Sequence, residues 1–172
     1  MKIVLLGYMG SGKTAIGKIL SKNLYLDFTD LDQLIERKEG KTISEIFNEN
    51  GEVYFRKIET KYLKEFIHTH DSFVLSLGGG TPCYGENMKE IINDKDIISF
   101  YLQASIQTLC QRLSNNRSKR PLLFSLTEQE MSEYIAKHLF ERTVFYNQAR
   151  VKINTNDKDL DTIVAEIRIH LH

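Results

Sequence analysis

Apolar residues fall into short, mostly continuous runs, separated by stretches that carry apolar residues at helical spacing. Runs with little alternation of polar residues are typical of strands that are buried on both faces. Their alternation with helices predicts an α/β fold, in which helices cover both sides of a parallel sheet. The predicted strands cover residues 3–6, 25–28, 72–77, 97–102 and 151–155.

The intervening segments have apolar positions three and four residues apart, as amphipathic helices do. The longest predicted helix runs from about residue 52 to residue 68, after an interruption expected at Gly51. Two capping boxes, which begin at Thr42 and Thr127, predict the start of two further helices. The side chains of the longest helix that should face the core are Phe55, Ile58, Tyr62, Phe66 and Ile67. Other helices are predicted over residues 31–38, 88–92, 105–113, 127–146 and 160–171.

The composition is that of an ordinary globular protein, because 41% of the 172 residues are hydrophobic. A chain of 20.0 kDa suits a single domain, residues 1–172. Basic and acidic residues balance at 23 each, which argues against general nucleic-acid binding. The sequence has no apolar run long enough to span a bilayer and no secretory signal pattern at its start. Cys83 and Cys110 make no disulfide framework, so we expect a reducing, cytoplasmic location. We also expect a monomer without a membrane partner.

The segment Gly7–Thr14, Gly-Tyr-Met-Gly-Ser-Gly-Lys-Thr, has the spacing of a phosphate-binding loop. An apolar strand precedes it and helical spacing follows it, which is the context that such a loop requires. Its glycines allow successive N–H groups to face phosphate oxygens, and the helix N-terminus adds partial positive charge. Lys13 can reach the outer phosphates, and the Thr14 hydroxyl can bind magnesium. The alternative is a tight strand-to-helix turn with an exposed lysine.

Two further strand ends should converge with this loop, because ligands of open α/β sheets bind at the carboxyl ends of the strands. Asp30 and Asp32 follow the second predicted strand. On an extended segment they would point to the same side, so that one serves magnesium and the other the attacking hydroxyl. Alternatively, they simply stabilise a helix N-terminus. The third strand ends in Ser76 and the triplet Gly78–Gly80, which allows close approach of a small ligand.

Arginines supply the positive charge for an anionic substrate. Arg56 has Glu59 three residues later on the same predicted helix, and a fixed arginine offers two parallel donors to a carboxylate. The alternative is an exposed surface pair. Arg117 and Arg120 lie in a polar, basic stretch that is predicted to be a mobile loop. A closing loop of this kind can bring positive charge to a phosphoryl group and exclude water.

The ordered set of motifs resembles the shikimate kinase family, within the P-loop kinases related to nucleoside monophosphate kinases. The resemblance rests on residues 7–14, 30–32, 55–59, 75–80 and 120–123, and on Arg142 with Tyr146. It implies a three-layer P-loop kinase fold, with helices on both sides of a five-stranded parallel sheet of order 2-3-1-4-5. It also implies a substrate-binding helical region at about residues 31–62 and a mobile lid at about residues 112–125.

The resemblance implies transfer of the ATP γ-phosphate to the 3-hydroxyl of shikimate, with Mg2+, on the route to chorismate and the aromatic amino acids. The implied catalytic residues are Lys13, Asp30, Asp32 and Arg120. The implied nucleotide-binding residues are Gly10, Ser11, Gly12, Lys13, Thr14, Ala15, Arg112, Arg117 and Arg120. Shikimate would be bound by Asp32, Arg56, Gly78, Gly79, Gly80 and Arg142. The metal would be held by Thr14, Asp30 and Ser76, the last through a water.

One departure concerns the loop after the last strand, where many relatives have a proline near the adenine. Here that loop reads Asn156–Leu160 without proline, so Arg112 or Arg117 is the expected adenine partner. Other functions stay open at this point. Gluconate kinase is the nearest alternative, because gluconate is also a polyhydroxy acid. A nucleoside monophosphate kinase or a nucleotide-switched binding protein would need a second base site or switch segments, and neither is legible.

Overall fold

The computed structural model describes residues 1–115, 123 and 125–171, so the predicted loop residues Arg117 and Arg120 lie outside the described part. Its core is a five-stranded sheet of order β2-β3-β1-β4-β5, and each neighbouring pair is parallel. The predicted strand order is therefore confirmed. The strands are β1 (Lys2–Leu6), β2 (Phe28–Asp30), β3 (Phe73–Ser76), β4 (Ile97–Gln103) and β5 (Val151–Asn154).

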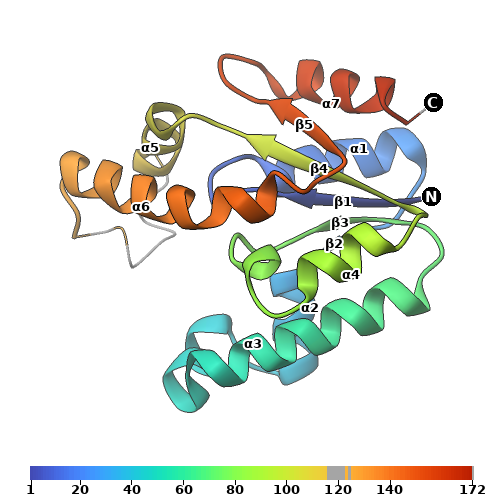
Figure 1. Ribbon diagram of the computed structural model, residues 1–172, viewed down its shortest axis with the longest axis horizontal. Coiled ribbons are helices and arrows are strands. Elements are labelled where there is room, and N and C mark those ends of the chain that lie inside the picture. The colour runs from blue at the N-terminus through green and yellow to red at the C-terminus, as the bar shows by residue number, and fades with distance from the viewer. Residues whose placement is uncertain (116–122, 124, 172) are drawn as a thin grey trace.

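Helices connect the strands and cover both faces of the sheet (Figure 1). The helices are α1 (Lys13–Leu24), α2 (Leu31–Glu39), α3 (Ile43–Thr69), the short 3-10 helix η1 (Thr81–Cys83), α4 (Asn87–Asn93), α5 (Ile106–Ser114), α6 (Glu128–Tyr146) and α7 (Leu160–Ile169). Helices α1 and α7 lie on one face, whereas α3, α4 and α6 lie on the other. Within the described part of the chain, no helix is long and apolar enough to cross a bilayer.

Alternate side chains of the central strand, β1, are buried in two separate hydrophobic cores, one on each face of the sheet. Ile3 and Leu5 pack with the apolar side chains of α1 and α7, and Val4 and Leu6 pack with those of α3, α4 and α6. All four side chains are fully buried. This two-sided burial is why the strand reads as a continuous apolar run rather than as an alternating one. The five inward-facing residues predicted on the longest helix are likewise all buried.

The register brings the three predicted strand ends to one edge of the sheet. Ser76 at the end of β3 pairs with Leu5 of β1 on one side and with Asp30 of β2 on the other. Because all pairs are parallel, the loop after β1 emerges at the same edge as Asp30 and Ser76.

The start of the second strand differs from the prediction, whereas the break in the longest helix agrees with it. The second strand begins at Phe28 rather than Tyr25, because Tyr25 ends α1 in a left-handed conformation (φ 55°) and is 96% exposed. The predicted interruption at Gly51 is confirmed, since its φ of 80° and ψ of 174° break the helical geometry within α3. An L side chain at this φ is strained, which favours glycine here.

Candidate active site

As predicted, a glycine-rich loop of residues 7–12 connects β1 to α1, and Lys13 and Thr14 form the start of that helix. Gly7, Gly10 and Gly12 have φ values of 145°, 82° and 96°, a region that other residues rarely adopt. A Cβ atom on Gly7 would lie 2.7 Å from the Leu102 carbonyl oxygen of β4, so the loop is tightly packed on the sheet. Gly12 is the N-cap of α1 and provides no side-chain hydrogen bond to the first helical N–H groups. Backbone donors at such a position suit an anion.

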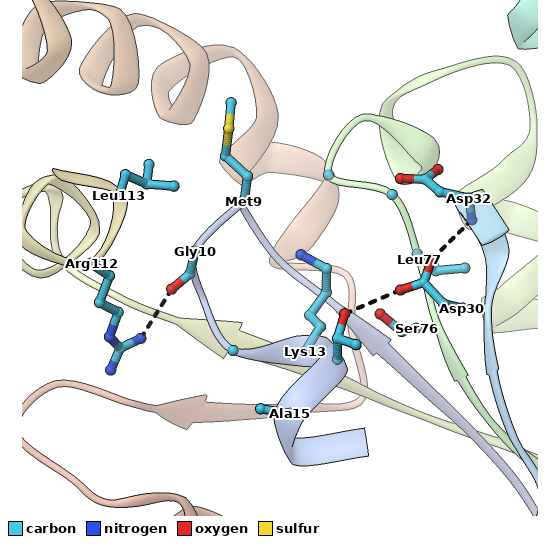
Figure 2. Close-up of a pocket in the computed structure, with 14 residues that line it drawn as sticks. Met9, Gly10, Lys13, Ala15, Asp30, Asp32, Ser76, Leu77, Arg112 and Leu113 are labelled. Carbon is cyan, nitrogen blue, oxygen red and sulfur yellow. Dashed lines mark hydrogen bonds between the residues drawn. The ribbon is translucent and has the colours of Figure 1, made fainter. Parts of the chain in front are cut away.

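The Lys13 side chain contacts this loop and does not extend into solvent. Its Nζ donates to the carbonyl oxygens of Gly7 at 2.8 Å and Tyr8 at 3.0 Å, and only 9% of the residue is exposed. The alternative of a simple turn with an exposed lysine is therefore excluded. The ammonium group points into the space between the loop and the two aspartates (Figure 2).

A cavity of ≈ 580 Å³ lies at this edge of the sheet (Figure 2). It joins the phosphate loop, the two aspartates and the end of β3, which confirms that the three strand ends share one crevice. Three residues of the predicted acceptor site, Arg56, Gly80 and Arg142, are not in its lining. The lining residues are Met9, Gly10, Gly12, Lys13, Thr14, Ala15, Asp30, Asp32, Ser76, Leu77, Gly78, Gly79, Arg112 and Leu113.

Asp30 and Asp32 reach the cavity from a strand end and a helix start, not from one extended segment. Asp30 ends β2 and caps α2, where its Oδ1 accepts from the N–H groups of Asp32 at 3.1 Å and Gln33 at 3.3 Å. Its Oδ2 accepts from the Thr14 hydroxyl at 3.1 Å. The predicted same-side geometry on an extended segment is wrong, because the helix already begins at Leu31. The capping role is real for Asp30, and both carboxylates still line the cavity.

The surroundings of the Asp32 carboxylate strongly raise its pKa. Burial, followed by the negative charges of Asp30 and Glu59, raises its pKa from 3.8 to about 6, against the opposing effect of Lys13. A Cβ atom on Gly78 would lie 3.0 Å from Asp32 Oδ1, so the carboxylate faces the glycine triplet. A carboxylate with this pKa can accept a proton from a nearby hydroxyl more readily than an ordinary aspartate can.

The buried carboxylate of Glu59 holds the Arg56 guanidinium in place. Its Nη1 donates to Glu59 Oε1 at 2.8 Å, and Glu59 Oε2 accepts from the Thr81 hydroxyl at 2.7 Å. Glu59 is 1% exposed, which excludes the alternative of an exposed surface pair. A Cβ atom on Gly80 would lie 2.7 Å from Arg56 Nη2, so a side chain at this position would displace the guanidinium. The pair sits at the glycine triplet, beside the cavity.

Helix α6 presents a row of polar side chains, four residues apart, to the same region. Tyr146 Oη donates to the Gly79 carbonyl oxygen at 2.5 Å, and Arg142 Nη1 lies 3.6 Å from the position of a Cβ atom on Gly79. One turn earlier, His138 Nδ1 lies 2.8 Å from Tyr8 Oη in the phosphate loop. No sequence motif pointed to His138. Its spacing from Arg142 was the only available signal, because its partner lies 130 residues away.

Three oxygen-bearing residues at the end of the sheet fit a magnesium ion. Ser76 Oγ is buried and has no hydrogen-bond partner in the described part of the chain, and it lies beside Asp30 in the sheet. Thr14 adds a hydroxyl to this set. Among the described residues there is no cluster of three or more His, Cys, Asp or Glu side chains that could hold a metal ion. Magnesium bound with nucleotide phosphates needs no such cluster, because water and phosphate oxygens complete its shell.

Arg112 connects the phosphate loop to the segment after β5. Its guanidinium donates to the carbonyl oxygens of Gly10 at 3.3 Å and Thr155 at 2.7 Å. Figure 2 shows it on the side of the loop that lies away from the aspartates. Burial lowers the pKa of Arg112. The other candidate for the adenine contact, Arg117, lies outside the described residues, as does Arg120.

Comparison with known proteins identifies the family. The family model described as shikimate kinase matches residues 9–172. The chain belongs to the shikimate kinase family. A shikimate kinase from Flavobacterium psychrophilum is 52% identical over 166 residues, which cover 96% of each chain.

Solved structures of shikimate kinases agree with this fold over nearly the whole chain. A shikimate kinase from Bacteroides thetaiotaomicron has a TM-score of 0.91 at 33% identity and covers 99% of this chain and 98% of its own. One from Acinetobacter baumannii, solved in complex with shikimate, has a TM-score of 0.86 at 32% identity. The match covers 99% of this chain and 92% of that one. The alternatives of a gluconate kinase, a nucleoside monophosphate kinase or a nucleotide switch are not favoured.

Proposed function

We propose that this shikimate kinase family member transfers the γ-phosphate of ATP to the 3-hydroxyl of shikimate, which yields shikimate 3-phosphate and ADP. The observation that carries the proposal is that one cavity is lined by the phosphate loop, by Asp32 and by Gly78 and Gly79 of the glycine triplet. A donor phosphate on the loop would then lie next to a carboxylate suited to an acceptor hydroxyl. The related structure from Acinetobacter baumannii, which holds shikimate, supports the choice of acceptor.

The nucleotide would bind along the loop and the first turn of α1. Backbone N–H groups of the loop face the phosphates, and Lys13 neutralises the charge that grows on the transferred group. Thr14 and Asp30 would hold Mg2+, and Ser76 would hold one of its waters. When bound, the metal offsets negative charge on the phosphate oxygens. The loop and flanking residues assigned to the nucleotide are Gly10, Ser11, Gly12, Lys13, Thr14, Ala15 and Arg112.

The acceptor would bind on the other side of the cavity, at the glycine triplet. Asp32 would orient the 3-hydroxyl and accept its proton as the oxygen attacks phosphorus. Arg56 and Arg142 would bind the acceptor carboxylate through charge-assisted hydrogen bonds. The triplet Gly78–Gly80 keeps this wall free of side chains, and both arginines lie directly against it.

Different segments of the chain would bind the two substrates. The helical region of about residues 31–62 would bind shikimate, and a lid of about residues 112–125 would bring Arg117 and Arg120 to the phosphates. Residues 116–122 and 124 of this segment lie outside the described part. We also propose a monomer in the cytoplasm. The two cysteines are unpaired, as suits a reducing compartment.

Product identification tests the proposal directly. The protein is incubated with MgATP and shikimate, and the product is analysed by phosphorus–proton correlation NMR. A new phosphate resonance coupled to the proton on carbon 3 is expected. Coupling to the proton on carbon 4 or 5, or the absence of a phosphorylated product, would contradict the proposed transfer.

A further inference from the structure

The outer side of Arg56 is covered by two residues outside the known motifs, Tyr84 and Glu52. The Arg56 Cζ atom lies 3.9 Å from the centroid of the Tyr84 ring, which is close for a cation–π contact. Tyr84 Oη donates to Glu52 Oε1 at 2.9 Å, and the same carboxylate oxygen lies 3.6 Å from Arg56 Nε. The three side chains thus form a closed ring of contacts.

The contacts from Glu59, Glu52 and Tyr84 leave one edge of the Arg56 guanidinium uncovered, the edge that carries Nη2. Glu59 takes Nη1 from the buried side, Glu52 faces Nε, and the Tyr84 ring covers one face. Nη2 makes no hydrogen bond to any residue in the described ranges, and it lies against Gly80. The group is therefore held so that its Nη2 edge faces the glycine triplet.

A cavity next to these contacts gives Arg56 room to adopt another rotamer if the contacts are lost. A second cavity of ≈ 610 Å³ opens on the outer side of Arg56, away from the phosphate loop. An arginine without the ring contact could turn into this space, because its side chain has many rotamers of similar energy. The lining residues of this cavity are Glu52, Val53, Arg56, Lys57, Thr60, Tyr84 and Gly85.

We propose that Tyr84 and Glu52 are positioning residues that hold Arg56 toward the acceptor and so make the enzyme selective for a carboxylate. The inference rests on the proposed role of Arg56 in binding that carboxylate. Holding the guanidinium before the acceptor arrives removes an entropic cost from binding. Tyr84 supplies the stacking face, and Glu52 fixes the tyrosine hydroxyl and attracts Nε. Neither residue touches the acceptor in this scheme.

The central test is the Tyr84→Ala variant, with KM measured for shikimate and for ATP. Loss of a cation–π contact of this kind should raise the shikimate KM about tenfold and leave the ATP KM unchanged. Tyr84→Phe keeps the ring and loses only the hydroxyl, so a rise of about two- to threefold is expected. The Phe variant also provides a readout if the Ala variant does not fold.

Tyr54→Ala is the matched control. Tyr54 is 37% exposed, against 36% for Tyr84, and its hydroxyl also donates to a carboxylate, Glu39, at 3.1 Å. It belongs to α3 but takes no part in the contacts that join Arg56, Tyr84 and Glu52. Both KM values should stay at the wild-type level in this variant. A rise in the shikimate KM as large as that of Tyr84→Ala would overturn the inference.

Shikimate methyl ester separates positioning from a general structural effect, because it lacks the carboxylate charge. The ratio of kcat/KM for the acid to that for the ester should fall about tenfold in Tyr84→Ala. In an Arg56→Ala background, Tyr84→Ala should cause no further fall, since the residue acts through Arg56. An equal loss for acid and ester would overturn the inference. An unchanged acid-to-ester ratio in Arg56→Ala alone would instead overturn the proposed role of Arg56.

Discussion

The ionisation of Asp32 should control the activity of this enzyme below neutral pH. A pKa of about 6 leaves about one-tenth of this carboxylate ionised at pH 5, whereas a pKa of 3.8 would leave about nine-tenths ionised. Because only the ionised form can accept a proton from the acceptor hydroxyl, kcat/KM for shikimate should fall about tenfold per pH unit below about pH 6.

The assay is the pH profile of kcat/KM for shikimate from about pH 5 to about pH 8. His138 is the main competitor for such an effect, because burial and Arg142 lower its pKa from 6.5. The profile is therefore repeated with His138→Gln, in which the acid limb should keep its midpoint. An acid limb near pH 4 would contradict the reasoning about Asp32, and so would a limb that disappears with His138→Gln.

The same shift has a consequence for stability. The folded state raises the pKa of Asp32, so it binds more protons than the unfolded state between pH 3.8 and about 6. Asp32 should therefore lower stability progressively as the pH rises through this window. Asp32→Asn removes the effect and should raise Tm more at pH 7 than at pH 4. An equal change in Tm at both values would show that the folded state does not perturb this carboxyl.

Three substitutions test other parts of the molecule. Lys13→Ala should lower kcat at least about a hundredfold with an unchanged circular dichroism spectrum, because phosphate charge loses its main partner; near-normal kcat would contradict the loop assignment. Gly80→Ala would place Cβ 2.7 Å from Arg56 Nη2, so the shikimate KM should rise at least about tenfold while the ATP KM holds. An equal rise in both would point to general damage. Gly17→Ala would place Cβ 2.4 Å from the Phe28 ring and should cost about 1–3 kcal/mol in urea unfolding, whereas a neutral result would mean that the ring moves freely.

The fold was predictable because the strands of a covered parallel sheet are apolar throughout. The exception is the start of β2, where Tyr25 and Leu26 look like strand residues. Tyr25 instead closes α1, since its N–H bonds back to Lys22 and its φ is positive. Hydrophobicity does not encode this backbone conformation, and tyrosine is not the residue expected there.

The site was predictable where the chemistry depends on local spacing. The loop Gly7–Thr14 and the pair Arg56–Glu59 each lie within a few residues of one another, so a pattern can record them. The contact between Tyr8 and His138 and the stacking of Tyr84 on Arg56 join distant segments. They depend on how α6 and η1 pack onto the sheet, and no local pattern carries that information. Arg142 was assigned to the candidate site only through the family resemblance.

The most direct test of the central claim is ADP release from MgATP with shikimate, gluconate, AMP or no acceptor. Rapid turnover is expected with shikimate, and only background hydrolysis in the other three reactions. Turnover with gluconate or AMP at a rate equal to that with shikimate would contradict the assignment of the acceptor pocket. Equal ADP release with and without acceptor would contradict the claim that the cavity joins a donor phosphate to an acceptor hydroxyl.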